Sequence, residues 1–432
     1  MRNRSFNLGP LEVVIPVILA IVAGLVIFVA LAPGTGFGRT SNPNLVRIYT
    51  SVPMNNFASI VHGVEMALDE ANNRAGSFQV ELIALNGAPT LDGNWDATVE
   101  LSNARRAVED PDAVVYIGTY NSGAAKISIP VLNRVNMAMI SPGNTYPGLT
   151  KPGTGNAGEP FTYYPLGVRN YFRVVPADDL QGSAAVAFAQ QQGVKSIYVL
   201  DDTELYGKGI AIIVAQAARD AGLEVKGGPE SIDVRANDYT QLADRIISAG
   251  PDLVYFGGYS YNHAGIVLRN LRESGYDGLF MGADGIQDDV FIEDVNSSGA
   301  PAGEVYSTLV GLPASQLSGP GREWYRLYKA LYPNDKNEDF APFGYEAARV
   351  ALHAIEKAGT KDRESIRAAV ASTTSADLPE PHILGDWHFD ANGDTSLVSI
   401  SVQDLQDRWT YRGLLVYNPE TRTWAYQAAQ QP

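Results

Sequence analysis

Short apolar runs alternate with helix-length periodic segments along the chain from Val46 onward. The run VRIYTSV (46–52) is typical of a buried strand, and apolar residues between Phe57 and Ala71 then recur at spacings of three and four, as one helix face requires. The same alternation predicts strands at 80–85, 113–119, 137–141, 171–175, 196–202, 223–227, 252–259 and 278–285, and helices near 95–108, 122–134, 179–192, 207–221, 238–249 and 262–275. Short strands between helices indicate βαβ units and mainly parallel sheets that are covered on both faces.

The number of predicted strands indicates how the chain is divided. Roughly ten strands are too many for one simple unit, so we expect an α/β fold with two doubly wound parallel-sheet lobes. Residues 146–171 interrupt the alternation with many Pro and Gly residues, four Tyr and no periodicity. A loop of that length is either functional or an added decoration.

The N-terminal region carries the longest apolar stretch. All 20 residues from Val13 to Ala32 are apolar, and a helix of that length spans roughly 30 Å, the hydrocarbon core of a bilayer. Arg2 and Arg4 precede it, which places residues 1–12 in the cytoplasm and the globular part outside. We predict a single-pass membrane anchor followed by a linker at 33–44. A cleaved secretory signal is the alternative, since small residues end the stretch, although a proline follows them directly.

Charge and composition narrow the class of protein. Hydrophobic residues make up 45% of the 432 residues and charged residues 19%, which is typical of a folded chain. Lys and Arg number 32 against 48 Asp and Glu, so the net charge is −16. An acidic surface repels phosphate backbones, and we expect no nucleic acid partner. The chain has no cysteine, which excludes disulfides, thiolate metal sites and a cysteine nucleophile.

Motifs for cofactors and catalysis are absent from the sequence. There is no GxxxxGK[ST] phosphate loop, no HExxH and no GxSxG. A GxGxxG at 153–158 stands between prolines rather than between a strand and a helix, so it does not indicate dinucleotide binding. Asp390, Asn392 and Asp394 occupy the first oxygen positions of a calcium loop, but a glycine comes too early and a serine replaces the closing glutamate. We interpret that segment as a tight turn and predict a non-enzymatic protein with no metal or cofactor.

Hydrogen-bond donors follow two of the predicted strands, at the ends where doubly wound sheets bind ligands. Ser122 opens a helix after the strand at 113–119, and Thr145 with the backbone N–H of Gly143 follows the strand at 137–141. Hydroxyl and backbone donors near a helix N-terminus suit a carboxylate. Each residue also has an ordinary explanation as a helix cap or turn residue.

An acceptor and two aromatic residues follow strands of the second predicted lobe. Asp284 suits an ammonium group, although Asp-Gly is also a common turn. Tyr206 and Tyr259 supply flat walls with a hydroxyl and a cation–π contribution, or simply pack between helices. Donors from one lobe and an acceptor from the other favour a ligand with both charges that bridges the lobes.

Six segments with a common order lie between about Val46 and Asp394. They are SPGNTYPGLT (141–150), DDTELYGKG (201–209), VYFGGY (254–259), LRESGYDGLFMGADG (271–285), FGYEAARVALHAIEKAGTKDRESIRAAV (343–370) and FDANGD (389–394). In these segments the chain resembles the type I periplasmic-binding fold, specifically the branched-chain amino acid-binding proteins of ABC transporters. The resemblance implies two lobes joined by hinge crossings that close on one small molecule. Lobe 1 would comprise 45–172 with about 302–380, and lobe 2 would comprise 173–301 with about 381–428.

The resemblance also implies roles for the candidate residues. In the family, residues matching Ser122, Gly143 and Thr145 hold the ligand carboxylate. Residues matching Asp284 and the two tyrosines hold the amino group and cover the side chain. Asp284 is shorter than the glutamate of some members, and the stretch at 146–171 is longer than the family pattern, so the ligand side chain stays open.

The predicted function is the extracytoplasmic solute-binding component of an ABC importer, with a branched-chain or similar amino acid as ligand. ABC permease subunits would be its partners, and the N-terminal helix would hold it at the membrane. The alternatives are a ligand-sensing regulatory protein of the same fold, an enzyme of unrecognised type, and a binder of amides, urea or aromatic acids.

Overall fold

The computed structural model of the protein describes residues 41–89, 94–297, 299, 301–418 and 420–429. The predicted membrane anchor or signal at 13–32, the residues before it and most of the linker lie outside this part. Within the described part, no helix is both long and apolar enough to cross a bilayer. The described residues from Ser41 onward belong to one unit.

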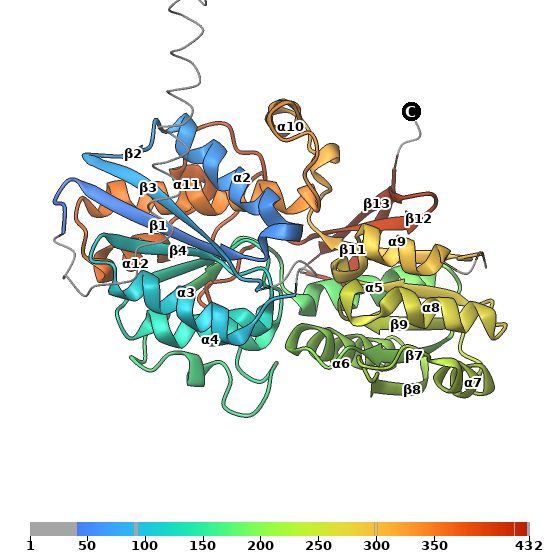
Figure 1. The fold of residues 1–432 in the computed structure, drawn as a ribbon. Helices are drawn as coiled ribbons and strands as arrows, with labels where there is room; N and C mark the ends of the chain where they lie inside the picture. The colour runs from blue at the N-terminus through green and yellow to red at the C-terminus, as the bar shows by residue number, and fades with distance from the viewer. Residues whose placement is uncertain (1–40, 90–93, 298, 300, 419, 430–432) are drawn as a thin grey trace, which may run out of the picture. The chain divides into compact units, whose positions relative to one another are not determined.

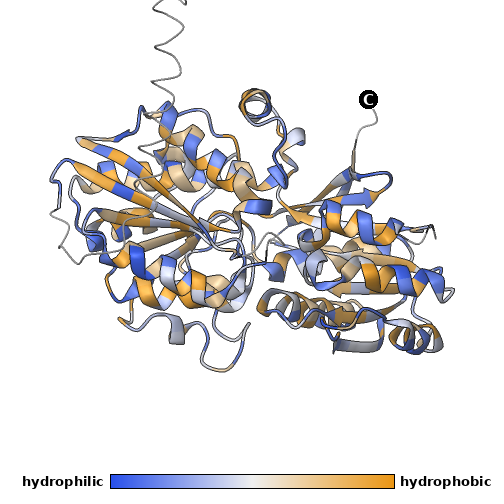
Figure 2. Ribbon diagram, viewed as in Figure 1, coloured by the Kyte–Doolittle hydropathy of each residue, from blue (hydrophilic) through white to orange (hydrophobic). Residues whose placement is uncertain are grey.

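Six strands form the first sheet, in the order β2-β3-β1-β4-β5-β6. Every neighbouring pair is parallel except β2 with β3. The strands are β1 (Leu45–Val52), β2 (Arg74–Ala75), β3 (Phe78–Asn86), β4 (Ala113–Gly118), β5 (Ala138–Ser141) and β6 (Tyr171–Arg173). All residues of β4 and β5 are buried, as continuous apolar strands require when helices cover both faces. Figure 2 shows the apolar residues concentrated on the strands and on the inner sides of the helices.

Helices from both ends of the chain cover the first sheet. They are α2 (Met54–Glu70), α3 (Ala97–Glu109), α4 (Ser122–Asn133), α11 (Ala341–Ala358) and α12 (Arg363–Ala371). Helices α2 and α11 lie side by side on one face, while α3 and α4 cover the other (Figure 1). The C-terminal part of the chain therefore completes the lobe that the N-terminal part begins.

Eight strands form the second sheet, in the order β14-β13-β12-β11-β10-β9-β7-β8. They are β7 (Ser196–Asp201), β8 (Glu224–Ser231), β9 (Leu253–Gly257), β10 (Leu279–Gly282), β11 (Val305–Val310), β12 (Ser399–Leu405), β13 (Trp409–Asn418) and β14 (Thr423–Ala428). Strands β7 to β11 pair in parallel, whereas β12, β13 and β14 pair antiparallel. The two-lobe α/β prediction is confirmed, but the second sheet is not purely parallel, because hairpins add its last strands. Strand β11 also belongs here, so the chain leaves this sheet after residue 310 rather than at about 302.

Helices also cover both faces of the second sheet. They are α5 (Asp178–Gln191), α6 (Leu205–Asp220), α7 (Thr240–Ala249), α8 (Ala264–Glu273) and α9 (Asp289–Asn296). One face packs on α5 and α6 and the other on α7, α8 and α9. A further helix, α10 (Pro320–Leu331), packs Trp324 against Tyr345 of α11, with 5.3 Å between ring centroids.

The chain passes between the sheets after β6, after β11 and before β12. These segments lie beside one another, because Arg173 forms an isolated bridge with Asp394 and Gly311 forms one with Ile400. In the last passage, Asp390 accepts the backbone N–H groups of Asn392 and Asp394 at 2.8 and 2.9 Å. The predicted tight turn is therefore present.

The stretch at 146–171 is an ordered loop with its own polar centre. The buried carboxylate of Glu159 accepts the hydroxyl of Tyr146 at 2.8 Å and the backbone N–H of Asn156 at 2.7 Å. Tyr163 donates to the same carboxylate. Although burial opposes it, these donors hold the pKa of Glu159 below its usual value. The loop is thus fixed by a charged hydrogen-bond network rather than by regular secondary structure.

The contact between α2 and α11 depends on the absence of a side chain at Gly63. A Cβ atom there would lie 2.1 Å from the carbonyl oxygen of Ala341. We predict that Gly63→Ala lowers the free energy of unfolding by about 1–3 kcal/mol, even though alanine favours a helix over glycine by about 1 kcal/mol. Chemical denaturation measures the change, and Arg105→Ala at an exposed position of α3 should stay within about 0.5 kcal/mol of wild type. Unchanged stability of Gly63→Ala would show that the two helices separate without cost.

Candidate functional site

Both sheets reverse their strand order at one point, and three of the six candidate residues follow strands at these points, while Gly143 and Thr145 follow the adjacent β5 and Asp284 follows the adjacent β10. In the first sheet the reversal lies between β1 and β4, and in the second between β7 and β9. A crevice opens there at the carboxyl ends of parallel strands, because neighbouring crossover connections lead away in opposite directions. Ser122 follows β4, Tyr206 follows β7 and Tyr259 follows β9.

The first lobe brings its three candidate residues together in buried loops. Ser122 begins α4, and its Oγ accepts the backbone N–H of Tyr146 at 3.4 Å. Thr145 lies next to Tyr146 in sequence, and both Ser122 and Thr145 are buried. The N–H of Gly143 donates to the Oγ of Ser141 at 3.2 Å, so it is already engaged.

Gly143 has a steric role beside the candidate site. A Cβ atom at this position would lie 2.9 Å from Cδ2 of Tyr120. The ring of Tyr120 therefore packs directly on the backbone of the loop that carries Thr145. A larger residue at 143 would displace this ring.

The second lobe places its acceptor among hydrogen-bond donors. Asp284 begins the short 3₁₀ helix η4 (Asp284–Ile286) and is buried. Its Oδ1 accepts Nε2 of Gln181 at 2.7 Å and the hydroxyl of Tyr206 at 3.4 Å. The backbone N–H of Tyr259 donates to Asp202 at 2.9 Å, and the rings of Tyr206 and Tyr259 lie 4.9 Å apart.

Aromatic rings connect the two lobes. Tyr120 stacks on Phe57 with 3.5 Å between ring centroids and meets the edge of Phe340 at 5.0 Å. Its ring centroid is 6.1 Å from that of Tyr259 in the other lobe. Nδ2 of Asn121 also donates to the hydroxyl of Tyr261 across the lobes, at 3.0 Å. The polar candidates thus lie beside an aromatic wall that both lobes build.

Two buried residues of α5 belong to the same region and were not predicted from the sequence. Asp178 and Gln181 are fully buried, and the backbone N–H of Asp178 donates to the carbonyl of Thr145 at 2.9 Å. Among the described residues, Oε1 of Gln181 has no hydrogen-bond partner, and the Asp178 carboxylate accepts no hydrogen bond of normal geometry, although the Thr145 hydroxyl lies close enough to influence it. Both residues follow β6, so the strand-end rule that selected Asp284 would have found them had it been applied to that strand.

Burial perturbs the two carboxylates of this region. Burial raises the pKa of Asp284 from 3.8 to about 6. Burial and the nearby Asp284 raise the pKa of Asp178, while the Thr145 hydroxyl and Arg173 partly oppose the rise. Two buried carboxyl groups with unused acceptor capacity are suited to a ligand that brings a positive charge and N–H donors.

The geometry agrees with a comparison to known families. The periplasmic binding protein family matches residues 49–402. The chain belongs to this family. The leucine-, isoleucine-, valine-, threonine-, and alanine-binding protein of Pseudomonas aeruginosa is 28% identical over 348 residues, which cover 79% of this chain and 83% of the relative. Membership confirms the prediction of a binding protein rather than an enzyme.

Solved structures of other periplasmic binding proteins share the fold. A leucine binding protein from Thermotoga maritima has a TM-score of 0.72 and 23% identity, and the match covers 87% of this chain and 99% of that chain. A solute binding protein from R. palustris in complex with benzoate has a TM-score of 0.66 and 16% identity, with 86% and 96% covered. At these identities the likeness establishes the fold and leaves the ligand of this chain open.

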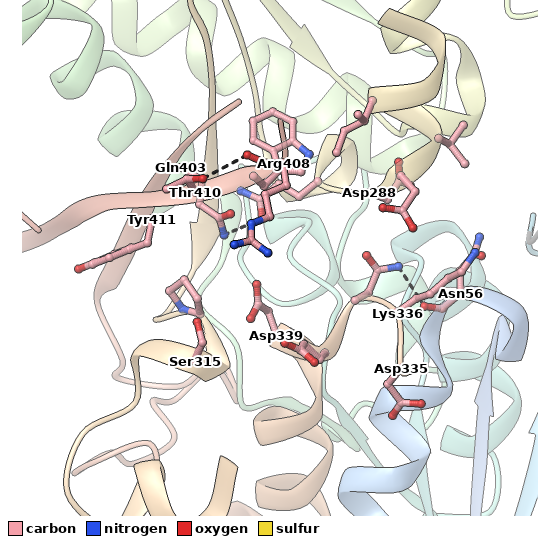
Figure 3. Close-up of a pocket in the computed structure, with 18 of the residues that line it drawn as sticks. Asn56, Asp288, Ser315, Asp335, Lys336, Asp339, Gln403, Arg408, Thr410 and Tyr411 are labelled. Carbon is pink, nitrogen blue, oxygen red and sulfur yellow. Dashed lines mark hydrogen bonds between the residues drawn. The ribbon is translucent and has the colours of Figure 1, made fainter. Parts of the chain in front are cut away.

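A cavity of about 730 Å³ in this periplasmic binding protein is lined partly by sequence neighbours of the aromatic wall. Its lining includes Asn56, Asp339 and Gln287, which lie close in sequence to Phe57, Phe340 and Asp284. Figure 3 shows Arg408 and Asp339 pointing toward each other across the cavity. The charged lining residues are Asp288, Asp289, Asp335, Lys336, Glu338, Asp339 and Arg408. Among the described residues that line the cavity there is none of the six candidate residues, and because its carboxylates outnumber its cations the cavity favours positively charged groups.

No metal site accompanies these carboxylates. In the part of the chain that the structure describes, no group of three or more His, Cys, Asp or Glu could hold a metal ion.

The raised pKa of Asp284 predicts a pH-dependent stability without ligand. At low pH the carboxyl is protonated in both the folded and the unfolded chain; between about pH 4 and 6 only the unfolded chain releases the proton, so the free energy of unfolding falls as pH rises. Asp284→Asn removes this loss. Relative to wild type, the variant should gain about 2–3 kcal/mol between pH 4 and pH 7, measured by chemical denaturation at both values. A difference that does not change with pH would contradict the buried environment of Asp284.

Proposed function

We propose that this periplasmic binding protein is the solute-binding component of an ABC importer and binds an amino acid between its two lobes. Ser122 and Thr145 would receive the carboxylate, with Gly143 leaving room for the Tyr120 ring beside them, and Asp284 would bind the ammonium group beside Tyr206 and Tyr259. The support is the family, the names of its relatives and the burial of these residues around one region. The observation that carries the proposal is the pair of buried carboxyl groups of Asp178 and Asp284. Among the described residues, no lysine, arginine or histidine forms a salt bridge with either of them.

Contacts to both lobes give the ligand its effect on conformation. A ligand that bonds Thr145 in one lobe and Asp284 in the other stabilises the arrangement in which both contacts exist. A permease that binds this arrangement better than an open one would then respond to the ligand. The predicted helix at 13–32 would keep the binding protein at the external face of the membrane that holds the permease.

A second class of ligand is favoured by the aromatic wall. Phe57, Tyr120 and Phe340 offer ring faces and edges on which an aromatic acid could stack, and the R. palustris structure contains benzoate. An anion without an ammonium group would leave Asp178 and Asp284 unpaired in a buried site, which costs free energy. Amino acids therefore rank first, and aromatic acids, amides and urea remain alternatives. A sensor with the same site would bind the ligand without importing it, so a measurement of ligand uptake distinguishes the sensory role from the transport role.

A ligand screen tests the proposed class. We expect one or more zwitterionic amino acids, with leucine, isoleucine or valine foremost, to raise the melting temperature of the protein. At 100 times its dissociation constant a ligand stabilises the folded state by about 2.7 kcal/mol. Thermal shift against the twenty amino acids, amino acid amides, urea, benzoate and 4-hydroxybenzoate measures the effect. A shift with aromatic acids alone would overturn the amino acid assignment.

The ammonium contact predicts a pH-dependent affinity. Asp284→Asn should weaken binding of the best amino acid at least 30-fold, because loss of one partner of a buried charged pair costs about 2 kcal/mol or more. In wild type, affinity should fall roughly tenfold per pH unit below about pH 6, where the free protein holds a proton on Asp284. Isothermal titration calorimetry from pH 4.5 to 8 measures both effects. Asp289→Asn, which removes an exposed carboxylate nearby, is the matched control and should bind as wild type does.

A further inference from the structure

Arg173 is a fully buried charged residue at the first passage between the lobes. It ends β6, directly before the chain enters the second lobe, and its side chain has 0% exposure. A guanidinium in such a position is strongly destabilising unless ion pairs and hydrogen bonds use its donors. The partners of Arg173 therefore show what this charge holds in place.

One edge of the guanidinium holds the loop that carries Thr145. Nη1 donates to the carbonyl of Asn144 at 3.2 Å and to the carbonyl of Tyr146 at 3.0 Å. Nη2 donates to the hydroxyl of Thr150 in the same loop. The two carbonyls flank Thr145 in sequence, so a single planar group fixes the backbone on both sides of the proposed carboxylate contact.

The other edge of Arg173 holds the last passage between the lobes. Nε donates to Oδ1 of Asp394 at 2.6 Å, and the backbone N–H of Arg173 donates to the carbonyl of Gly393 at 3.0 Å. Oδ2 of Asp394 in turn accepts the hydroxyl of Thr150 at 3.1 Å. Two segments that join the lobes and the loop after β5 thus meet at one ion pair.

We propose that Arg173 is a positioning residue that makes the conformation of the 143–150 loop depend on the passages between the lobes. The inference rests on the proposed function, in which this loop receives the ligand carboxylate. When the lobes move, the two passages shift relative to each other, and the guanidinium transmits the shift to the carbonyls of Asn144 and Tyr146. The carboxylate contact is then complete only in the arrangement that also brings Asp284 to the ligand.

The chain offers a matched control in Arg169. This residue stacks over the ring of Tyr164 at 5.0 Å and donates to the carbonyl of Thr150 at 3.1 Å. Arg169 thus contacts the same loop without being bonded to the carbonyls beside Thr145. Lysine in place of either arginine keeps the charge and removes the planar fork that several acceptors require.

The first experiment needs no ligand. Hydrogen–deuterium exchange is measured on wild type, Arg173→Lys and Arg169→Lys, with peptides that cover residues 143–150. Loss of the hydrogen bonds from the Arg173 guanidinium should raise exchange in this loop at least fivefold in Arg173→Lys. Exchange in Arg169→Lys should stay near that of wild type. Equal exchange in all three proteins would overturn the proposal whether or not an amino acid binds.

The second experiment separates positioning from general destabilisation. L-Leucine and L-leucinamide, which lacks the carboxylate, are titrated into wild type, Arg173→Lys, Thr145→Val and the double variant. Arg173→Lys should weaken leucine binding about tenfold and leave leucinamide binding within a factor of two, and Thr145→Val should cost little more in the Arg173→Lys background. An equal loss for both compounds, or effects of the two substitutions that multiply, would overturn the positioning role.

Two further results keep the tests decisive. If Arg173→Lys does not fold, Asp394→Asn weakens the same ion pair from its other side and should give the same exchange and binding pattern. Absence of binding by any of the twenty amino acids to wild type would contradict the proposed function, while the exchange experiment would still decide the role of Arg173; if another amino acid binds in place of leucine, it and its amide are used in the titrations.

Discussion

Parallel strands impose the constraint on which the rest of this structure depends. All carboxyl ends of a parallel sheet meet at one edge, and helices must return the chain across its faces. In each lobe the connections diverge beside a single strand pair, β1 with β4 and β7 with β9. The loops at these two points carry Tyr120 and Ser122 from one lobe and Tyr206 and Tyr259 from the other. Residues that are distant in the sequence become neighbours because the strand order brings the loops that carry them to the same edge of each sheet.

The carboxyl groups within this crevice are less hydrated than those on the protein surface. The chain carries a net charge of −16, and exposed carboxylates are well hydrated. Asp178 and Asp284, in contrast, lie among aromatic rings and have few donors, so burial raises the pKa of each. Arg173 is fully buried and its charge acts on Asp178, but its donors are committed to Asp394 and to backbone carbonyls. In the proposed function, a cationic ligand group is stabilised by these two carboxylates, of which only Asp284 accepts hydrogen bonds from Gln181 and Tyr206.

The long loop at 146–171 takes part in the contact between the lobes. Its first residue, Tyr146, follows Thr145 directly, bonds Glu159 through its hydroxyl and lies against Gly209 of α6. A Cβ atom at Gly209 would be 2.4 Å from the ring of Tyr146, so glycine permits the close approach. The loop is thus continuous with the proposed carboxylate contact and reaches the other lobe. This connection assigns it a structural role beyond decoration.

Local sequence patterns are enough to predict most elements before residue 285 and the residues that follow their strands. Periodicities of two and 3.6 are local properties, so most strands before residue 285, most helices, the turn at Asp390 and the placement of Ser122, Thr145 and Asp284 after strand ends could be predicted, whereas β11 to β14 were not. Tertiary structure alone decided that α11 packs on α2, that β12 to β14 form hairpins on the second sheet, and that Arg173 bonds both Asp394 and the Thr145 loop. These features depend on which surfaces meet after the chain has crossed between lobes. No local pattern predicts such long-range pairings. An apolar helix face can be buried against many apolar surfaces, and a polar side chain can bond many partners, so only the folded chain selects among them.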